Sequence, residues 1–319
     1  MNRKITLLIS AIFVITVISG VFLLSLFIEA PVKNVTVTIP KGSGLAETAE
    51  ILNQNDVISN KYIFMAYAVA SGKNKNFYPG SYVFETGSSY SYIVTSLARG
   101  PKKIVYKVTV PEGFTVDQIA SKMNRKTGMS QVKFMEAFEA FKTENPGLGE
   151  GYLFPDTYFF EGEAKPEYVI KAMYNQFNNE TKSLKPLQGY SFKQMVIVAS
   201  LVETEARRND ERGLIASVIY NRLKKGMRLE IDATVQFALP KRKEKLSRKD
   251  LFVSSPYNTY RNKGLPPGPI CNPGILSLKS ASNPAKSGYL YYVLTDTKSG
   301  KHFFTDNYDA FLNAKRKAK

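Results

Sequence analysis

Hydrophobic residues follow one another almost without interruption over residues 195–202, where Ser200 is the only polar one. A helix that is apolar on all sides is buried inside a domain. The pattern therefore predicts a central buried helix over residues 195–208. Two carboxylates, Glu203 and Glu205, stand at the polar end of this helix.

The two carboxylates are expected to differ in their surroundings. Helical residues two positions apart point about 200° away from each other. Glu203 precedes Arg207 by four residues, the favoured spacing for an ion pair on a helix. Glu205 instead follows the apolar residues Leu201 and Val202 by one turn. Their desolvating effect is expected to raise the pKa of the Glu205 carboxyl, as a general acid near neutral pH requires.

A second pattern repeats three times, over residues 37–52, 82–97 and 108–123. Each copy predicts a short alternating strand, a glycine turn and an amphipathic helix. The aligned positions are Gly42, Gly87 and Gly113; Ile39, Phe84 and Val110; Thr48, Ile93 and Ile119; and Leu52, Leu97 and Met123. Units this small do not bury a core alone, so they are expected to pair their strands. We read residues 32–100 as one small β/α domain and the third copy as opening a linking α/β region over 101–185.

The N-terminal residues 5–28 carry no charge. A membrane span needs about 20 such residues, whereas the apolar core of a cleaved signal peptide has only about 7 to 15. We therefore expect an uncleaved single-pass anchor in the cytoplasmic membrane. Arg3 and Lys4 would hold the tail, residues 1–4, in the cytoplasm and leave the rest of the chain outside it.

The rest of the chain alternates predicted helices with turns and one β-hairpin. The helices are expected over residues 130–142, 167–177 and 210–225, and the hairpin over 289–305. Residues 226–236 have polar residues at strand or turn spacing, and residues 255–285 are rich in Pro, Gly and Asn, which predicts a long functional loop. The fold class is therefore α+β, with the catalytic domain over residues 186–319.

Residues 150–160 are too aromatic for a solvated loop. Pro155 and Asp156 predict a turn within this apolar run, and the rings expected to pack on both sides of it are Tyr152, Phe154, Tyr158 and Phe159. Stacking on carbohydrate is the sharper alternative to a purely structural role for these rings.

The composition narrows the choice of partner and of chemistry. With 44 Lys and Arg against 27 Asp and Glu, the formal net charge is +17, which favours a polyanionic neighbour. Because the folded part is expected outside the cytoplasm, a membrane surface or an anionic wall polymer fits better than nucleic acid. The single cysteine excludes an internal disulfide and a cysteine zinc cluster, and a Ser-His-Asp triad would have to use His302, the only histidine.

Four sequence motifs follow one another along the chain in a characteristic order. They are EGYLFPDTY at 150–158, ASLVETEA at 199–206, NRLKKGMRLEIDATVQ at 221–236, and YNTY with GLPPGPICNPG within 257–274. In this order, behind an N-terminal anchor, they resemble the YceG-like family of endolytic murein transglycosylases. The repeat region resembles, more loosely, the LysM type of wall-binding module, with a structural scaffold as the alternative.

The family resemblance implies an enzyme that cuts peptidoglycan strands internally, between N-acetylmuramic acid and N-acetylglucosamine. It implies no metal and no cofactor, and it suggests peptidoglycan synthases or division proteins as partners. The second acid of the family's Glu-x-Glu motif, here Glu205, would act first as acid and then as base and leave 1,6-anhydro ends. The family commonly has a histidine at the position of Ala310 or Phe311, which this chain lacks. The other residues in matching motifs that are expected to bind substrate or support the site are Glu203, Arg228, Glu230, Asp232, Gln236, Tyr257, Asn258 and Asp156.

Two alternatives stay open at this point. One is a non-catalytic wall-binding or division-scaffold protein, and the other is a muramidase of the lysozyme type, which uses water and two carboxylates. The catalytic hypothesis requires Glu205 to lie in an open groove, with Tyr257, Asn258 and residues 150–158 expected nearby.

Overall fold

The computed structural model describes residues 33–73, 77–102, 105–162 and 164–318, in two compact units that meet in the sequence at Lys103 and Ile104. The architecture is mixed α+β, as predicted. The predicted tail (1–4) and membrane anchor (5–28) lie outside the described residues. Among the helices that the structure describes, none combines the length and the apolar character needed to cross a membrane.

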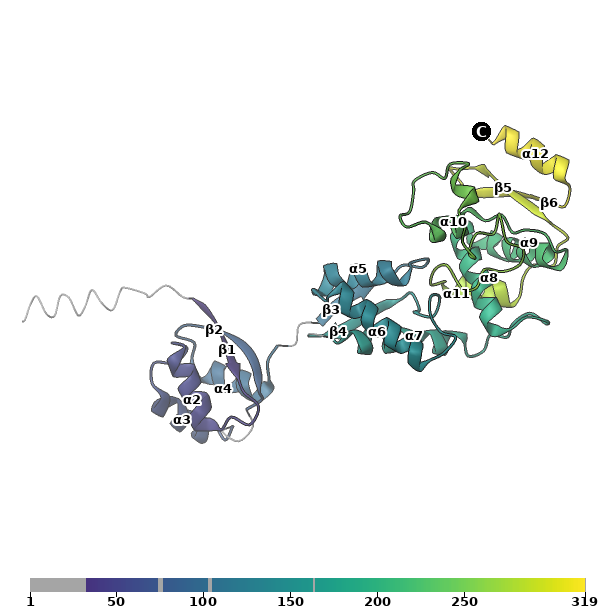
Figure 1. Ribbon diagram of the computed structural model, residues 1–319. Coiled ribbons are helices and arrows are strands. Elements are labelled where there is room, and N and C mark those ends of the chain that lie inside the picture. Colours follow the sequence, from purple (N-terminus) through teal and green to yellow (C-terminus); the bar gives the residue numbers. More distant parts are fainter. Residues whose placement is uncertain (1–32, 74–76, 103–104, 163, 319) are drawn as a thin grey trace, which may run out of the picture. The chain divides into compact units, whose positions relative to one another are not determined.

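The first unit is a two-stranded antiparallel sheet covered by helices (Figure 1). Its elements are β1 (Asn34–Ile39), α2 (Leu45–Gln54), α3 (Lys61–Ala70), β2 (Gly80–Glu85) and α4 (Tyr90–Arg99). The strands alternate, so that one face of the sheet, with Val37 and Phe84, is buried against the helices. The opposite face is open, and Val83 on it is 60% exposed.

The predicted repeat is confirmed as strand, turn and helix in all three copies. The apolar residues that align in the sequence all lie in the two cores, each at most 2% exposed: Ile39, Phe84 and Val110 on or just after the strands, and Ile93, Ile119, Leu52, Leu97 and Met123 on the helices. Gly42, Gly87 and Gly113 have φ of +93°, +78° and +77°. Residues with side chains rarely adopt this conformation, so the turn requires glycine.

The second unit begins with a lobe that we call the β3–β4 lobe, residues 105–181. It contains β3 (Val105–Thr109), α5 (Val116–Thr127), α6 (Gln131–Glu144), β4 (Thr157–Glu161) and α7 (Pro166–Thr181). β3 pairs antiparallel with β4, and the three helices share one core with this sheet. The strand of the third repeat therefore pairs with the aromatic segment and not with another repeat.

The aromatic segment is mostly structural. Tyr152 and Phe154 are buried, as expected, and their core joins this lobe to the next. The expectation for Phe159 was wrong, because β4 alternates and turns this ring outward, where it is 63% exposed, while Phe160 is buried.

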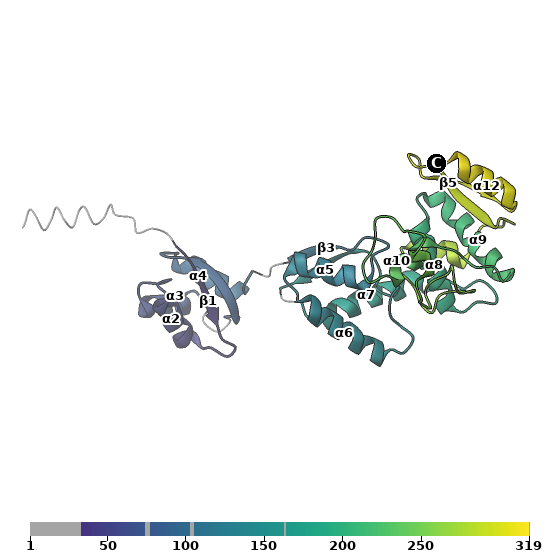
Figure 2. The same cartoon turned by 45° about the horizontal axis from the view of Figure 1, so that its top comes forward.

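The remaining residues form the α8 lobe, residues 192–317, built around a buried helix as predicted (Figures 1 and 2). Its elements are α8 (Phe192–Glu205), α9 (Arg212–Lys224), α10 (Asp232–Ala238), α11 (Ile275–Ser282), β5 (Tyr291–Asp296), β6 (Lys301–Thr305) and α12 (Tyr308–Lys317), with short 3-10 turns at Asn209–Glu211 and Asp250–Phe252. α8 packs against α9, α10 and α11, and α12 lies beside β5.

Two of its elements differ from the sequence expectation. Residues 226–236 were expected as strand or turn but contain the start of α10, and the predicted loop 255–285 contains α11. Both helices are short, and they are stabilised by packing on α8 rather than by their own helix propensity. The predicted hairpin is confirmed as β5 and β6, with Tyr291 opposite Thr305.

Candidate active site

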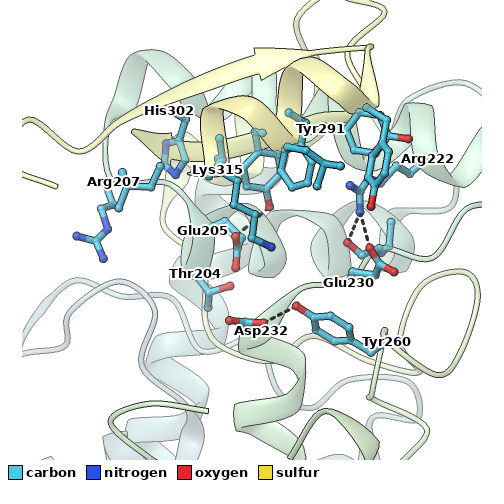
Figure 3. Close-up of a pocket in the computed structure, with 17 residues that line it drawn as sticks. Thr204, Glu205, Arg207, Arg222, Glu230, Asp232, Tyr260, Tyr291, His302 and Lys315 are labelled. Atoms are coloured by element: carbon cyan, nitrogen blue, oxygen red, sulfur yellow. Dashed lines mark hydrogen bonds and ion pairs between the residues drawn. The ribbon is translucent and has the colours of Figure 1, made fainter. Parts of the chain in front are cut away.

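Glu205 is the last residue of α8 because the chain leaves the helical conformation at the next residue. The helix begins with a capping box, in which the Ser191 hydroxyl accepts from the Gln194 amide at 3.2 Å. Ala206 is extended, with ψ of 124°, and this ends the helix. The half-buried Glu205 side chain thus leaves the core where a cavity of about 540 Å³ opens (Figure 3).

The Glu205 carboxyl group has a single hydrogen-bond donor in the described structure, the Tyr292 hydroxyl at 2.9 Å. Burial raises its pKa to about 7; the hydrogen bond from Tyr292 opposes this rise, and the negative charge of Asp232 adds to it. Both the acid and the carboxylate are therefore well populated near neutral pH. A group in this state can give up a proton and take one back.

One wall of the cavity comes from the start of α10 and the loop after it. Asp232, the first residue of α10, accepts a hydrogen bond of 2.5 Å from the Tyr260 hydroxyl. Glu230 stands beside it with φ of +52°, a conformation that non-glycine residues rarely adopt. The structure therefore brings two further carboxylates into the cavity that contains Glu205.

Arg222 of α9 connects this wall to the hairpin. Its Nε donates to the Leu290 carbonyl at 2.6 Å and its Nη1 to the Leu229 carbonyl at 2.7 Å. The guanidinium lies 5.3 Å from the Tyr291 ring centre and 3.9 Å from the Glu230 carboxylate. Because it joins the loop before α10 to β5, Arg222 fixes the width of the cavity.

The opposite wall is the β5–β6 hairpin, held from behind by a buried pair. Glu211 accepts from the His302 backbone amide at 3.0 Å, and its other oxygen lies 2.7 Å from His302 Nδ1. The His302 ring meets Tyr292 edge to face, with 5.7 Å between ring centres. The only histidine thus supports Tyr292, and no serine hydroxyl is hydrogen-bonded to it among the described residues.

The predicted ion pair between Glu203 and Arg207 is wrong, because α8 ends before Arg207. Glu203 points to the other side, where its carboxylate lies 3.0 Å from Arg212 Nη1 and accepts from the Gly274 amide at 2.9 Å. The Arg212 and Glu203 side chains are only 9% and 6% exposed. Glu203 therefore joins α8 to α9 and to the start of α11, away from the cavity.

The other residues singled out in the sequence lie outside this cavity. Asn258 is fully buried, and its amide group donates to the Leu251 and Val253 carbonyls at 2.9 Å, so it shapes the loop from within. Asp156 is exposed on the β3–β4 lobe and accepts from Gln176 at 3.0 Å. Arg228 is exposed, and no Arg228–Asp232 ion pair occurs in the described chain.

Gln236 and Tyr257 belong to the far side of α10. The Gln236 amide makes two hydrogen bonds to the Lys243 backbone, at 2.9 and 3.0 Å, and the Tyr257 ring packs on Phe237. The expected neighbourhood of Glu205 was therefore wrong in part, since Tyr257, Asn258 and residues 150–158 do not line its cavity. The requirement that Glu205 reach an open cavity is met.

Sequence reasoning missed Arg222, Tyr260 and Tyr292 as site residues. Arg222 and Tyr260 lie in or beside the motifs, but only the fold shows which partner each one meets. Among the described residues, no group of His, Cys, Asp and Glu side chains is arranged to hold a metal ion.

The family model and the relatives that match this chain point to one family. The model of the YceG-like family matches residues 37–317. The endolytic murein transglycosylase of Bacillus subtilis (strain 168) is 35% identical, over 94% of this chain and 91% of that protein. The endolytic murein transglycosylase of Streptococcus pneumoniae serotype 2 (strain D39) is 30% identical, over 86% of this chain and 56% of that longer protein.

A solved structure of a YceG-like protein is also similar to this chain. The crystal structure of a YceG-like protein from Listeria monocytogenes is 33% identical, covers 88% of this chain and 99% of its own, and superimposes with a TM-score of 0.58. The match of the family model extends through both units and includes the hairpin and α12. This chain therefore belongs to the YceG-like family.

Proposed function

We propose that this protein is an endolytic murein transglycosylase, a lyase that cuts peptidoglycan glycan strands between N-acetylmuramic acid and N-acetylglucosamine. The observation that carries the proposal is the Glu205 carboxyl group, with its pKa raised to about 7 by burial, at the edge of an open cavity. The names of its relatives in Bacillus and Streptococcus support the same activity.

In the proposed reaction one carboxyl group serves both steps. Protonated Glu205 donates its proton to the glycosidic oxygen as the bond from the anomeric carbon to that oxygen breaks. The resulting carboxylate then takes the proton of the muramic C6 hydroxyl, and the C6 oxygen bonds to the anomeric carbon. The products are a free hydroxyl on one fragment and a 1,6-anhydro end on the other, so no water is consumed.

The cavity walls suggest how the substrate is held. Tyr260, Tyr291 and Tyr308 line the cavity and offer rings on which sugars stack. Arg207 and Lys315 line it (Figure 3) and can meet a carboxylate on the glycan strand, either a free lactyl group or a stem-peptide carboxylate. Because Tyr308 and Lys315 come from α12, the C-terminal helix forms part of the binding surface.

The location and the wall contacts are part of the proposal. Residues 5–28 would anchor the chain in the cytoplasmic membrane with both described units outside the cytoplasm. The first unit would be a LysM-like module that holds glycan and keeps the enzyme on its substrate. Peptidoglycan synthases or division proteins are proposed partners because strand cutting must be coordinated with synthesis.

Digestion of purified sacculi tests the activity. We expect the native protein to release long fragments with anhydro-muramyl ends, detected by mass spectrometry. A complete lack of released material, together with retained binding to sacculi, would favour the non-catalytic scaffold instead.

A lysozyme-type muramidase is the second candidate, favoured by Asp232, which lines the same cavity as Glu205. The Asp232→Asn variant separates the two mechanisms. With a single catalytic carboxylate we expect a loss of rate below about tenfold, whereas loss of a second catalytic carboxylate would lower the rate about a hundredfold or more. Neutralising Asp232 also lowers the pKa of Glu205, so the alkaline limb of the pH–rate profile should move to lower pH.

Replacing Tyr292 by phenylalanine should shift the same profile in the opposite direction. The native rate is expected to fall above about pH 7, because the first step needs protonated Glu205. The Tyr292 hydroxyl stabilises the carboxylate, so its loss raises the pKa of Glu205 and moves the alkaline limb up by about one pH unit. A limb that stays in place or moves down would exclude this role for Tyr292.

A further inference from the structure

A second cavity, of about 480 Å³, lies between the β3–β4 lobe and the α8 lobe, on the other side of Thr204. Thr204 precedes Glu205 and lines both cavities. In the same way Asp232 lines the first cavity and its neighbour Ala233 lines the second. The two cavities therefore adjoin where α8 ends and α10 begins.

Charges of opposite sign stand on the two sides of this second cavity. Asp117, in the first turn of α5, comes from the β3–β4 lobe together with Glu150, whose pKa burial raises to about 7, and Arg242 comes from the loop that follows α10. The floor between them is apolar and includes Phe237 and Ile270. A ligand that fits this arrangement carries an amine, a carboxylate and an apolar part.

The charged groups are held in place by their surroundings. Glu150 accepts from the Val116 amide at 3.1 Å and from the Asn272 side chain at 2.8 Å. The loop with Arg242 is fixed by the next residue, Lys243, whose backbone pairs with Gln236 and whose amino group lies 2.6 Å from Asp250.

Arg242 is available to a ligand. No carboxylate lies within ion-pair distance of its guanidinium in the part of the chain that the structure describes, and the side chain is exposed. Its positive charge nevertheless affects Cys271, which lines the buried part of the cavity. Burial raises the pKa of the Cys271 thiol, Glu203 and Glu150 add to the rise, and Arg242 opposes it.

We propose that the second cavity binds the stem peptide attached to the muramyl residue at the cleavage site. This inference rests on the proposed function and names a second part of its substrate. The peptide starts from the lactyl group of the sugar ring, close to the bond that breaks. Three extended residues span about 10 Å, and the two cavities adjoin at Thr204, which lines both of them.

Peptide chemistry matches the lining better than a further sugar does. A stem peptide carries carboxylates for Arg242 and, in many walls, a free side-chain amine for Asp117. Its alanine methyl groups suit the apolar floor. A bare strand keeps only the lactyl carboxylate and has no amine for Asp117, so the cavity distinguishes peptide-bearing strands from bare ones.

Binding measurements with the full chain test the proposal without interference from cleavage. In a Glu205→Gln background, the Kd is measured for peptide-bearing glycan strands and for the same strands stripped by an amidase. We expect tighter binding of the peptide-bearing strands, and we expect Arg242→Gln to reduce this preference about tenfold. The matched control is Lys245→Gln, which removes an exposed charge from the same loop outside the cavity and should keep the preference.

Acetylation of the peptide amines tests the part of the cavity that contains Asp117. It should weaken binding in the same background but have little further effect once Asp117 is replaced by asparagine. The proposal is overturned if the starting protein shows no preference, if Arg242→Gln retains it, or if Lys245→Gln loses it equally, which would indicate a general effect of charge. A native protein that forms no anhydro ends would contradict the proposed function alone, because the binding preference is measured separately.

Discussion

Replacing Glu205 by glutamine is expected to lower the release of anhydro-muramyl ends about a thousandfold. Glutamine has nearly the same shape and can still accept the hydrogen bond from Tyr292, so the cavity keeps its geometry. It cannot donate a proton to the glycosidic oxygen or accept one from the C6 hydroxyl. The rate is measured by mass spectrometry of muropeptides released from sacculi.

The matched control for this variant is Glu230→Gln, at an exposed carboxylate in the same cavity. Its rate should fall by less than about tenfold, since the proposed mechanism uses only one carboxyl group for proton transfer. Unfolding curves should be similar for both variants. A Glu205→Gln protein that cuts sacculi at the native rate would remove Glu205 from the mechanism.

Replacing Glu203 by glutamine is expected to act on stability and to lower the free energy of unfolding of the second unit by about 3 kcal/mol. The change leaves the buried Arg212 guanidinium without its nearest carboxylate, and among the described residues Glu112, at 3.9 Å, is the only other one within ion-pair distance. It also weakens the link to the Gly274 amide at the start of α11. Thermal unfolding should occur about 6 to 12 °C lower.

The control for Glu203 is the same substitution at an exposed ion pair. Glu139 pairs with Lys142 at 2.7 Å, but the two side chains are 62% and 38% exposed. Water screens this pair, so Glu139→Gln should change stability by less than about 1 kcal/mol. Equal effects of the two substitutions would contradict a structural role for the buried pair.

The repeat and the central helix were predictable because their signals are local. Ile93 and Ile119 align in the sequence and occupy equivalent buried positions on α4 and α5. The run from Met195 to Val202 indicated burial on all sides, and the structure has it so. Such patterns depend only on the period of the helix or strand.

The elements that sequence reasoning missed depend on tertiary contacts. α11 lies in a segment rich in Pro, Gly and Asn and is stabilised by packing on α8, with Leu278 and Ala281 buried. The end of α8 at Glu205 was missed for a related reason. The sequence after it contains neither glycine nor proline before residue 213, and the chain turns there to bring Arg212 to Glu203.

Some residues of the candidate site were also predictable from sequence motifs, whereas others depend on tertiary contacts. Glu205, Glu230 and Asp232 were found because they stand in motifs, and the fold brings all three to one cavity. Tyr292 lies 87 residues from Glu205, and nothing in the alternation of β5 indicates that its hydroxyl reaches that carboxyl. The separation of Glu203 from Glu205 was predictable from helix geometry, although the partner of Glu203 was not.

The most direct test of the single-carboxylate mechanism is digestion of sacculi by the native protein in water enriched in heavy oxygen. In the proposed reaction the C6 oxygen of the sugar closes on the anomeric carbon. We therefore predict anhydro-muramyl ends that contain none of the heavy isotope. Reducing muramyl ends with heavy oxygen at the anomeric carbon would contradict this account and identify a hydrolase.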